Sequence, residues 1–305
     1  MGGRQHLASR VIPFSIAPSA IACPRSGGVP HELSALEVED IIETYVMCAV
    51  HCIEAVMDGV EIHGAQGHLI QQFVSPFSNR RNDDWGGTFE KRLRFPQEII
   101  RRVRTRVGAR AIVGYRMGVE EFTEGGLSID DTVKVAQALC EDGSIDYLSL
   151  AQGNFNSIET HLPDRHSPIL AYRDLHARFK AVANGAPVVA STRIQHPDQV
   201  ADMIADGEAD MIGLCRALLA DPDWPNKAKA GRSDTIRRCI ACNQCWAWIA
   251  GGEPIACATN PVTGREYRWK KLEQDRAETA KTVAIIGGGP GGLEAARVAA
   301  SRGHD

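Results

Sequence analysis

The sequence of 305 residues lacks long hydrophobic runs and blocks of like charge. No stretch approaches the about 18 consecutive apolar residues that a membrane-spanning helix needs, so we expect no transmembrane segment. The formal net charge is only -4, which gives no reason to expect binding to nucleic acid or to an acidic membrane surface. The hydrophobic content of 44% is that of an ordinary globular protein, and we expect its partners to be small molecules.

The N-terminal part also lacks the uninterrupted apolar core of a secretion signal. Between Arg10 and Cys23 the apolar stretch is short and is interrupted by Pro13 and Pro18. The nine cysteines are an odd number without the paired spacing of a disulfide framework, which indicates a reducing compartment where thiols stay free or bind metal. We therefore expect a cytoplasmic protein.

Four of the cysteines are close together in the sequence. Cys239, Cys242 and Cys245 form a C-x2-C-x2-C run, and Cys257 follows. Four thiolates are what a 4Fe-4S cluster requires, so these cysteines are the predicted cluster ligands. A structural zinc site is the alternative, although zinc usually takes four thiolates from two separate C-x2-C pairs. The other five are expected to be buried as small apolar side chains: Cys23, Cys48, Cys52, Cys140 and Cys215.

A glycine-rich turn follows the cysteines. Gly287, Gly289 and Gly292 have the G-x-G-x-x-G spacing, between a predicted strand at Thr282–Ile286 and a predicted helix at Leu293–Ser301. Such glycines let a pyrophosphate approach the backbone at the N-terminus of the helix. The turn predicts the start of a Rossmann-like domain for FAD, ADP or NAD(P)H.

The part of the chain before the cysteines alternates short apolar runs with amphipathic stretches, the pattern of repeated βα units on a parallel sheet. The predicted strands are Gly59–His63, Ala111–Met117, Tyr147–Ala151, Pro187–Thr192 and Met211–Arg216. The predicted helices run from a capping box at Ser34 to about Met57 and over Glu90–Val107, Asp130–Glu141, Tyr172–Val182 and Pro197–Asp206.

Polar and charged residues gather at the ends of these strands, as they do in a (β/α)8 TIM barrel. A complete barrel needs eight strands and typically about 250 residues. We therefore expect an N-terminally truncated TIM barrel with about five strands at residues 1–232, an iron–sulfur segment and linker at 233–280, and a truncated Rossmann-like start at 281–305. A complete small protein is the alternative, but it would leave an open sheet edge exposed.

The strongest motif lies at the end of the first predicted strand. The segment Val60–Leu69 reads VEIHGAQGHL, and a patterned loop from Gln72 to Phe95 follows it. Together with the cysteine run and the glycine turn, in the same order, these segments resemble the Old Yellow Enzyme family. The closest resemblance is to its iron–sulfur branch of trimethylamine and histamine dehydrogenases, N-demethylases and 2,4-dienoyl-CoA reductase. The resemblance covers nearly the whole chain, and Gly2-Gly3-Arg4 resembles the end of the family's third strand.

The resemblance implies an FMN across the barrel mouth. Arg116 stands where the family has an arginine near the pyrimidine edge of the flavin, and Arg193 and Arg216 stand where it has phosphate-binding arginines. A fixed guanidinium stabilises the negative charge of a reduced flavin, and its planar fork suits phosphate.

The resemblance also implies a substrate site. Ene-reducing members hold a carbonyl oxygen with two polar side chains, here His63 and Gln66, and protonate the substrate with a tyrosine, where this chain has His68. An imidazole, with an ordinary pKa of about 6.5, also accepts protons. The substitution therefore favours oxidation of an N-methylated amine or amino acid by hydride transfer to FMN. We expect the loop from Gly153 to Arg173 to line the pocket, with its histidines solvated.

Two alternatives stay open: an NAD(P)H-dependent ene-reductase of the 2,4-dienoyl-CoA reductase type, and an inactive fragment without cofactor. A cluster implies a second electron acceptor, either a separate electron-transfer protein or a nucleotide cofactor of the following domain. The sequence is compatible with a homo-oligomer but does not indicate one.

Overall fold

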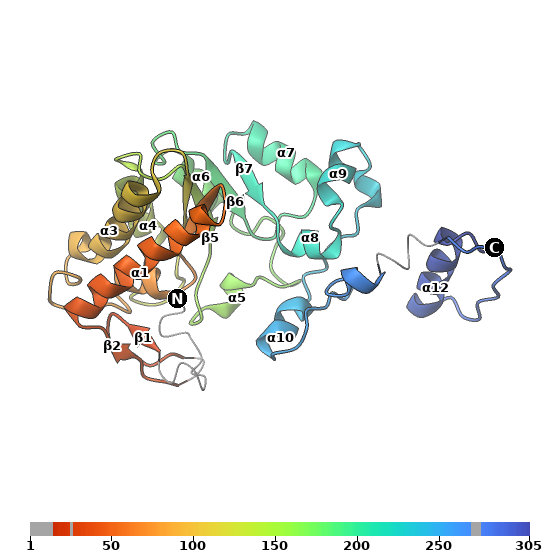
Figure 1. Cartoon of the computed structure of the whole chain (residues 1–305), viewed down its shortest axis with the longest axis horizontal. Coiled ribbons are helices and arrows are strands. Elements are labelled where there is room, and N and C mark those ends of the chain that lie inside the picture. Colours follow the sequence, from red (N-terminus) through yellow and green to blue (C-terminus); the bar gives the residue numbers. More distant parts are fainter. Residues whose placement is uncertain (1–14, 25–26, 270–275) are drawn as a thin grey trace. The chain divides into compact units, whose positions relative to one another are not determined.

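The computed structural model describes residues 15–24, 27–269 and 276–305, and the chain divides between Cys215 and Arg216 into two compact units (Figure 1). The predicted strand end at Gly2-Gly3-Arg4 lies outside the described residues. Within the described ranges, no helix is both long and apolar enough to span a bilayer.

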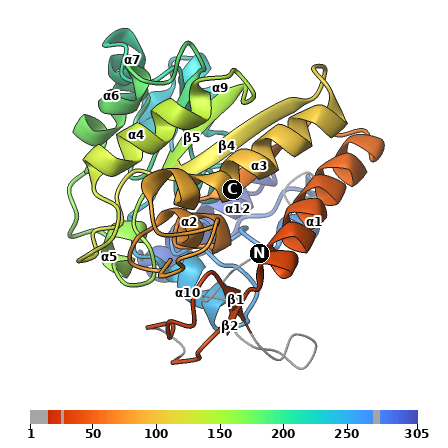
Figure 2. The same ribbon diagram turned by 90° about the vertical axis from the view of Figure 1, so that its left-hand side faces the viewer.

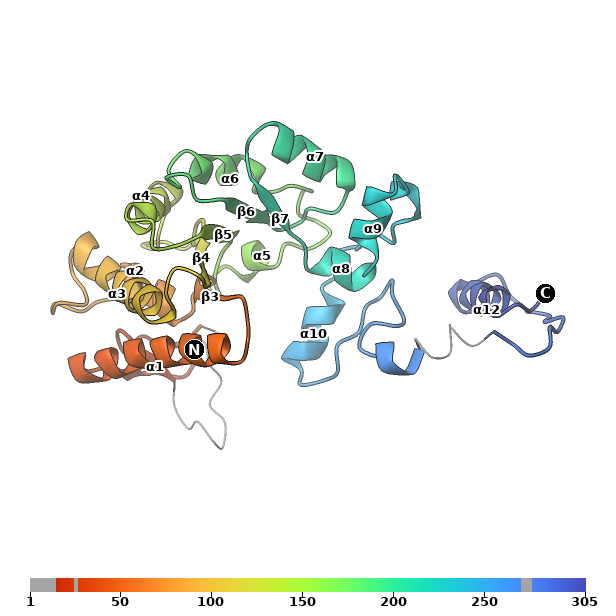
Figure 3. The same cartoon turned by 45° about the horizontal axis from the view of Figure 1, so that its top comes forward.

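The first unit is built on a parallel sheet of five strands, arranged in the order in which they occur along the chain. The strands are β3 Gly59–Gly64, β4 Ile112–Gly118, β5 Tyr147–Ala151, β6 Val188–Ser191 and β7 Met211–Gly213. Figure 3 shows the strands following one another along a curve, with α3, α4, α6 and α7 on its outer side. All five predicted strands are confirmed, although β6 and β7 are shorter than expected.

All five predicted helices of this unit are confirmed, with differences of a few residues at their ends, and two short helices, α2 and α5, were not predicted. They are α1 Ala35–Glu54, α2 Leu69–Val74, α3 Phe89–Val107, α4 Ile129–Cys140, α5 Ile158–His161, α6 Arg173–Lys180 and α7 Pro197–Ala205. The capping box at Ser34 is confirmed, because its hydroxyl accepts from Glu37 N at 3.3 Å and its N–H donates to the Glu37 carboxylate at 2.7 Å. Figure 2 shows α1 and α3 side by side, and the two helices are in contact.

A continuous apolar core lies between the sheet and these helices. At its centre the rings of Phe73 and Phe95 stack with their centroids 4.0 Å apart, and Trp85 meets Phe95 edge-on. Both phenylalanines are completely buried. This cluster joins α2 and its following loop to α3, so it fixes the segment that leaves the C-terminal end of β3.

A small parallel pair that the sequence did not predict, β1 Ile16–Ala17 and β2 His31–Glu32, lies near the N-terminus. Arg81 ties this pair to the loop after α2. Its guanidinium donates to the carbonyl oxygens of Pro18 and Leu33 and is paired in bidentate fashion with Asp83. A planar fork with several donors suits this position, where a single residue joins three segments.

The second unit contains short helices and loops. Its elements are α8 Arg216–Ala220, α9 Trp224–Lys229, the 3-10 helix η2 Ser233–Thr235, α10 Gln244–Ala250 and α12 Pro290–Ser301. The helix expected after the glycine turn is confirmed as α12. The strand expected at Thr282–Ile286 is not formed among the described residues, because its backbone pairs there with a single residue, Asp305, which donates to the carbonyl of Lys281 and accepts from the N–H of Val283.

The five scattered cysteines are only partly buried as expected. Cys23 and Cys140 are buried, which confirms the prediction for these two. Cys48 and Cys215 are exposed and Cys52 is half-buried, so the prediction was wrong for them. Cys48 and Cys52 lie off the buried stripe of α1, which is formed by residues spaced three to four apart: Val38, Ile42, Val46 and Ala49.

The Phe73–Phe95 stack gives a stability prediction. Phe95→Ala should lower the free energy of unfolding by about 3–5 kcal/mol, because it removes a fully buried ring and leaves a cavity. Urea denaturation measures the change. Leu36→Ala is the control, since Leu36 is 80% exposed on α1 and should change stability by less than about 0.5 kcal/mol. Equal losses in the two variants would contradict this description of the core.

Candidate active site and thiol pocket

The turn after β3 brings two predicted site residues together. The imidazole rings of His63 and His68 lie with their centroids 4.9 Å apart and an interplanar angle of 51°. Between them Gln66 and Gly67 both have left-handed backbone conformations, with φ of 60° and 71°. This tight turn returns His68, the N-cap of α2, toward the strand that carries His63. Gln66 itself lies in the turn and is half-buried.

A row of rings extends this pair. His68 meets Phe155 at 6.3 Å between centroids, and Phe155 meets His161 at 5.9 Å, both nearly edge-on. We call His63, His68, Phe155 and His161 the ring row. Sequence reasoning missed Phe155, although its position just after β5 is where the active-site loops of such folds begin. The expectation of solvated histidines was wrong for His161, which is half-buried in the row, and holds for the exposed His166.

Burial sets the charge of His63. It lowers the pKa of His63 to about 4, and the neighbouring His68 and Arg116 act in the same direction. An imidazole with this pKa is neutral at pH 7. Within the ring row, His63 is therefore an uncharged ring that accepts or donates a hydrogen bond.

Arg116 lies in register with His63 on the adjacent strand. Its Nε donates to Glu61 Oε1 at 2.6 Å, and Tyr147 Oη donates to Glu61 Oε2 at 3.0 Å. Burial, and then Glu61, raise the pKa of Tyr147 to about 12. This carboxylate joins three neighbouring strands and holds Arg116, and neither Glu61 nor Tyr147 was among the predicted site residues.

Arg193 follows β6 in an unusual conformation. Thr192 and Arg193 have φ of 83° and 57°, and for a β-branched residue such as threonine this is an outlier that costs on the order of 1–3 kcal/mol. The guanidinium is nearly buried and donates to the backbone carbonyl of Asp164. Arg116 lies near the C-terminal end of β4, and Arg193 follows the C-terminal end of β6, so both lie at the same edge of the parallel sheet.

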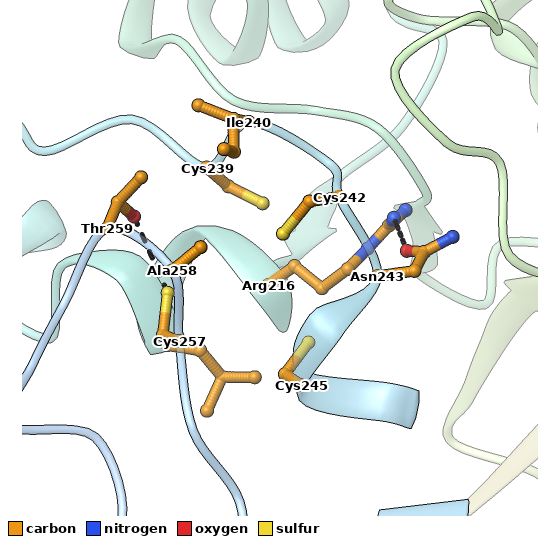
Figure 4. Close-up of a pocket in the computed structure, with 10 residues that line it drawn as sticks. Arg216, Cys239, Ile240, Cys242, Asn243, Cys245, Cys257, Ala258 and Thr259 are labelled. Atoms are coloured by element: carbon orange, nitrogen blue, oxygen red, sulfur yellow. Dashed lines mark hydrogen bonds between the residues drawn. The ribbon is translucent and has the colours of Figure 1, made fainter. Parts of the chain in front are cut away.

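The four predicted thiol ligands line one hollow in the second unit. Cys239, Cys242, Cys245 and Cys257 all line it (Figure 4). The loop curls because Ala241 and Asn243 have left-handed conformations, with φ of 50° and 55°. Within the described ranges, no three cysteine, histidine or acidic side chains converge closely enough to hold a single metal ion. The thiols therefore surround a space rather than meet at a point.

Arg216 also lines this hollow. Its guanidinium donates to Asn243 Oδ1 at 2.6 Å, in the middle of the cysteine run (Figure 4). Burial raises the pKa of the thiols of Cys239 and Cys245, while Arg216 and backbone N–H groups act in the opposite direction. A nearby guanidinium favours thiolates, the form in which cysteine binds metals. The predicted contact of Arg216 with a flavin phosphate stays a prediction.

The glycine turn leads directly into α12. Gly287 has φ of 108°, which only glycine adopts readily, and Gly289 is the N-cap of the helix. A Cβ at Gly292 would collide with the carbonyl of Gly287, so a glycine is needed where the turn closes on the helix. The role of these glycines in nucleotide binding stays a prediction.

Known proteins resemble this chain over almost its whole length. An NADH oxidase of Thermoanaerobacter brockii is 41% identical over 296 residues, which cover 95% of this chain and 44% of that protein. An N,N-dimethylglycine/sarcosine dehydrogenase of Chromohalobacter salexigens is 34% identical over 297 residues, which cover 96% of this chain and 43% of that protein.

A solved structure of 2-naphthoyl-CoA reductase with 2-naphthoyl-CoA matches with a TM-score of 0.92 and 29% identity, over 100% of this chain and 48% of its own. The chain thus spans less than half the length of these relatives. The TM-score confirms the fold class, a partial TIM barrel, and residues 13–235 match one family of flavoenzymes, which confirms the predicted resemblance. The chain belongs to the NADH:flavin oxidoreductase / NADH oxidase family.

Proposed function

We propose that the protein is an FMN- and 4Fe-4S-dependent oxidoreductase that oxidises an N-methylated amine or amino acid. When bound, FMN supplies a hydride acceptor, and the cluster passes electrons onward one at a time. The observation that carries the choice of substrate is the ring row, in which a half-buried, neutral His63 lies against His68 where ene-reducing relatives have a tyrosine.

The donor chemistry of the first unit fits FMN. Arg116, held by Glu61, is oriented and still partly exposed, with 37% of its side chain accessible, so it suits the edge of a flavin. Arg193 provides a second guanidinium at the same edge of the sheet, suited to a phosphate group. Arg216 is assigned to the phosphate by resemblance alone.

The thiol pocket fits an iron–sulfur cluster. Four thiolates arranged around a space match a cluster whose irons lie at separate corners, whereas a zinc ion needs them to converge on one point. The N–H of Ala241 donates to Cys239 Sγ at 3.3 Å, and such bonds to sulfur adjust cluster potentials. We propose that electrons leave through this site, to an electron-transfer protein or to FAD.

The ring row suits an amine substrate. Aromatic faces such as that of Phe155 attract methylated ammonium groups, and the neutral His63 accepts a hydrogen bond from a substrate N–H. We propose that His68 takes the proton that leaves the nitrogen before hydride transfer. Loss of a hydride from the N-methyl carbon gives an iminium, which water hydrolyses to formaldehyde and the demethylated amine. The likeness to an N,N-dimethylglycine/sarcosine dehydrogenase supports this class of substrate.

A second function, NAD(P)H-dependent ene-reduction, is favoured by the fold-level likeness to 2-naphthoyl-CoA reductase. Such chemistry needs a group that protonates the substrate carbon, and His68 stands where ene-reducing relatives have the tyrosine that does this.

We also propose a domain assignment. Residues 1–232 form the FMN domain, 233–280 the cluster segment, and 281–305 the start of a nucleotide-binding domain with Gly287, Gly289 and Gly292 at the pyrophosphate.

His68 gives the first test. His68→Phe should lower the rate of anaerobic flavin reduction by N,N-dimethylglycine about 10²- to 10⁴-fold, the usual contribution of an acid–base group, while FMN stays bound. Visible absorbance reports both the bound flavin and its reduction. His166→Phe is the matched control, because His166 is exposed. Undiminished reduction of the His68→Phe flavin would remove His68 from the mechanism, and bleaching by NADPH but not by amines would favour ene-reduction.

The cysteines give a second test. Protein purified without oxygen should carry about four iron atoms per chain and the broad visible absorbance of a cluster. Cys242→Ser should lose the iron because it removes one of four ligands, whereas Cys48→Ser, at an exposed cysteine of α1, should keep it. Elemental analysis measures both. About one zinc and no iron per chain would establish the structural zinc site instead.

His63 gives a prediction for pH. Its pKa is about 4 in the folded chain and about 6.5 when unfolded, so the unfolded chain binds more protons between these values. The free energy of unfolding therefore decreases as the pH is lowered through this window. His63 accounts for a loss of about 2 kcal/mol between about pH 7 and pH 5. Urea unfolding at pH 7 and at pH 5 measures this loss of stability. In His63→Phe the loss should be smaller than in the wild type by about 2 kcal/mol, and in His166→Phe it should equal that of the wild type. The same pH dependence in wild type and His63→Phe would disprove the burial effect.

A further inference from the structure

Glu121 is a buried carboxylate that none of the roles above uses. It lies in the loop after β4 and is 2% exposed. Its two oxygens accept four hydrogen bonds: Oε1 from Gln71 Nε2 at 3.2 Å and Asn154 Nδ2 at 3.3 Å, and Oε2 from Ser75 Oγ at 2.5 Å and Leu127 N at 2.7 Å. The donors come from α2 and its C-cap and from the loops after β4 and β5, so this one side chain joins three neighbouring segments.

One arm of this network reaches the turn that carries His68. Gln71 donates to Glu121 through Nε2 and accepts through Oε1 from the N–H of Gly67 at 2.8 Å. Gly67 immediately precedes His68 and has a left-handed conformation. Gly118 on β4 leaves room for this amide, because a Cβ there would lie only 2.8 Å from Gln71 Nε2. The position of the His68 turn is thus fixed through Gln71 by Glu121.

The other arm reaches Phe155. Asn154, the preceding residue, donates to the Glu121 carboxylate, and Ser157 donates to the Glu121 backbone carbonyl at 2.7 Å. The N–H of Asn154 in turn donates to Ser157 Oγ at 3.2 Å. Phe155 is therefore held from both sides by bonds that end on one residue. His68 and Phe155, whose rings meet 6.3 Å apart, are attached to the two arms of the same carboxylate.

The charged form of Glu121 is essential to this arrangement, because all four of its partners are N–H or O–H donors. An amide at the same position offers an acceptor on one side only and places its own N–H₂ against donors on the other. In either orientation a buried donor is left facing a donor, and the bonds on that side are lost. Glu121→Gln therefore disturbs one arm while almost preserving the volume.

We propose that Glu121 is a positioning residue that sets the spacing of His68 and Phe155 at the substrate site. It touches neither substrate nor cofactor and acts through Gln71 and Asn154. This inference rests on the proposed function in that the ring row is taken to hold the amine.

The test compares Glu121→Gln with Glu120→Gln, the adjacent and half-exposed carboxylate. N,N-dimethylglycine is mixed with the anaerobic protein, and the rate constant of flavin reduction in a single turnover is measured. Glu121→Gln should lower this rate constant about a hundredfold, as a displacement of about 1 Å does, with a smaller change in the substrate concentration that gives the half-maximal rate constant. Glu120→Gln should leave both unchanged. If Glu121→Gln only lowered the amount of folded protein, the amplitude of the absorbance change would decrease and the rate constant would stay the same. That result would overturn the proposal.

Two further measurements keep the test decisive. Gln71→Met cuts the arm to Gly67, and its effect on the rate constant should not add to that of Glu121→Gln, since both act through one chain of bonds. Full additivity of the two effects would overturn the proposal. If Glu121→Gln does not fold, the slower rate constant expected of Gln71→Met serves as the test in its place.

Hydrogen exchange of the backbone around Gly67 and Asn154 should be faster in Glu121→Gln than in the wild type, and unchanged in Glu120→Gln. The exchange measurement needs no substrate. It therefore tests the role of Glu121 even if dimethylglycine does not reduce the wild-type flavin and the proposed function is wrong. Unchanged exchange in Glu121→Gln would reject the proposal.

Discussion

The parallel, in-register pairing of β3 through β7 is the constraint on which the first unit depends. Because the strands run in the same direction, all their carboxyl ends lie at one edge of the sheet, and each loop that leaves that edge contributes to the candidate active site. The register puts His63 beside Arg116, and Arg116 in turn beside Ser149 on the next strand. A slip of one residue in any pair would turn these side chains to the opposite face.

The two candidate sites are built by different physical means. The ring row rests on a rigid sheet, and the loops above it are held by buried polar side chains whose hydrogen bonds are satisfied. In the second unit, the described residues form no strand, so the thiol pocket is built from loops and short helices. Its shape comes from alternate left-handed residues in a short loop, Ala241 and Asn243, and from the bond between Asn243 and Arg216.

Local signals in the sequence were sufficient for the strands, for the Ser34 cap and for the His63–His68 turn, since each depends on neighbouring residues. Features that depend on long-range contacts were missed. Glu61 gave no signal that it would join Arg116 to Tyr147, which follows it by 86 residues. Phe155 was missed for the same reason. The apolar run at 282–286 has the composition of a strand, but within the described residues its backbone bonds reach only Asp305, which is too little for a ladder.

The bond between Arg116 and Glu61 has a consequence for how a substrate reaches the protein. A guanidinium already paired with a carboxylate acts at a distance as a dipole, whose field falls away faster than that of a lone cation. Arg116 therefore attracts an anionic group only at short range. Under the proposed function, an amino acid substrate that binds at this edge of the sheet should owe little to long-range steering by Arg116, and its association rate should respond weakly to ionic strength.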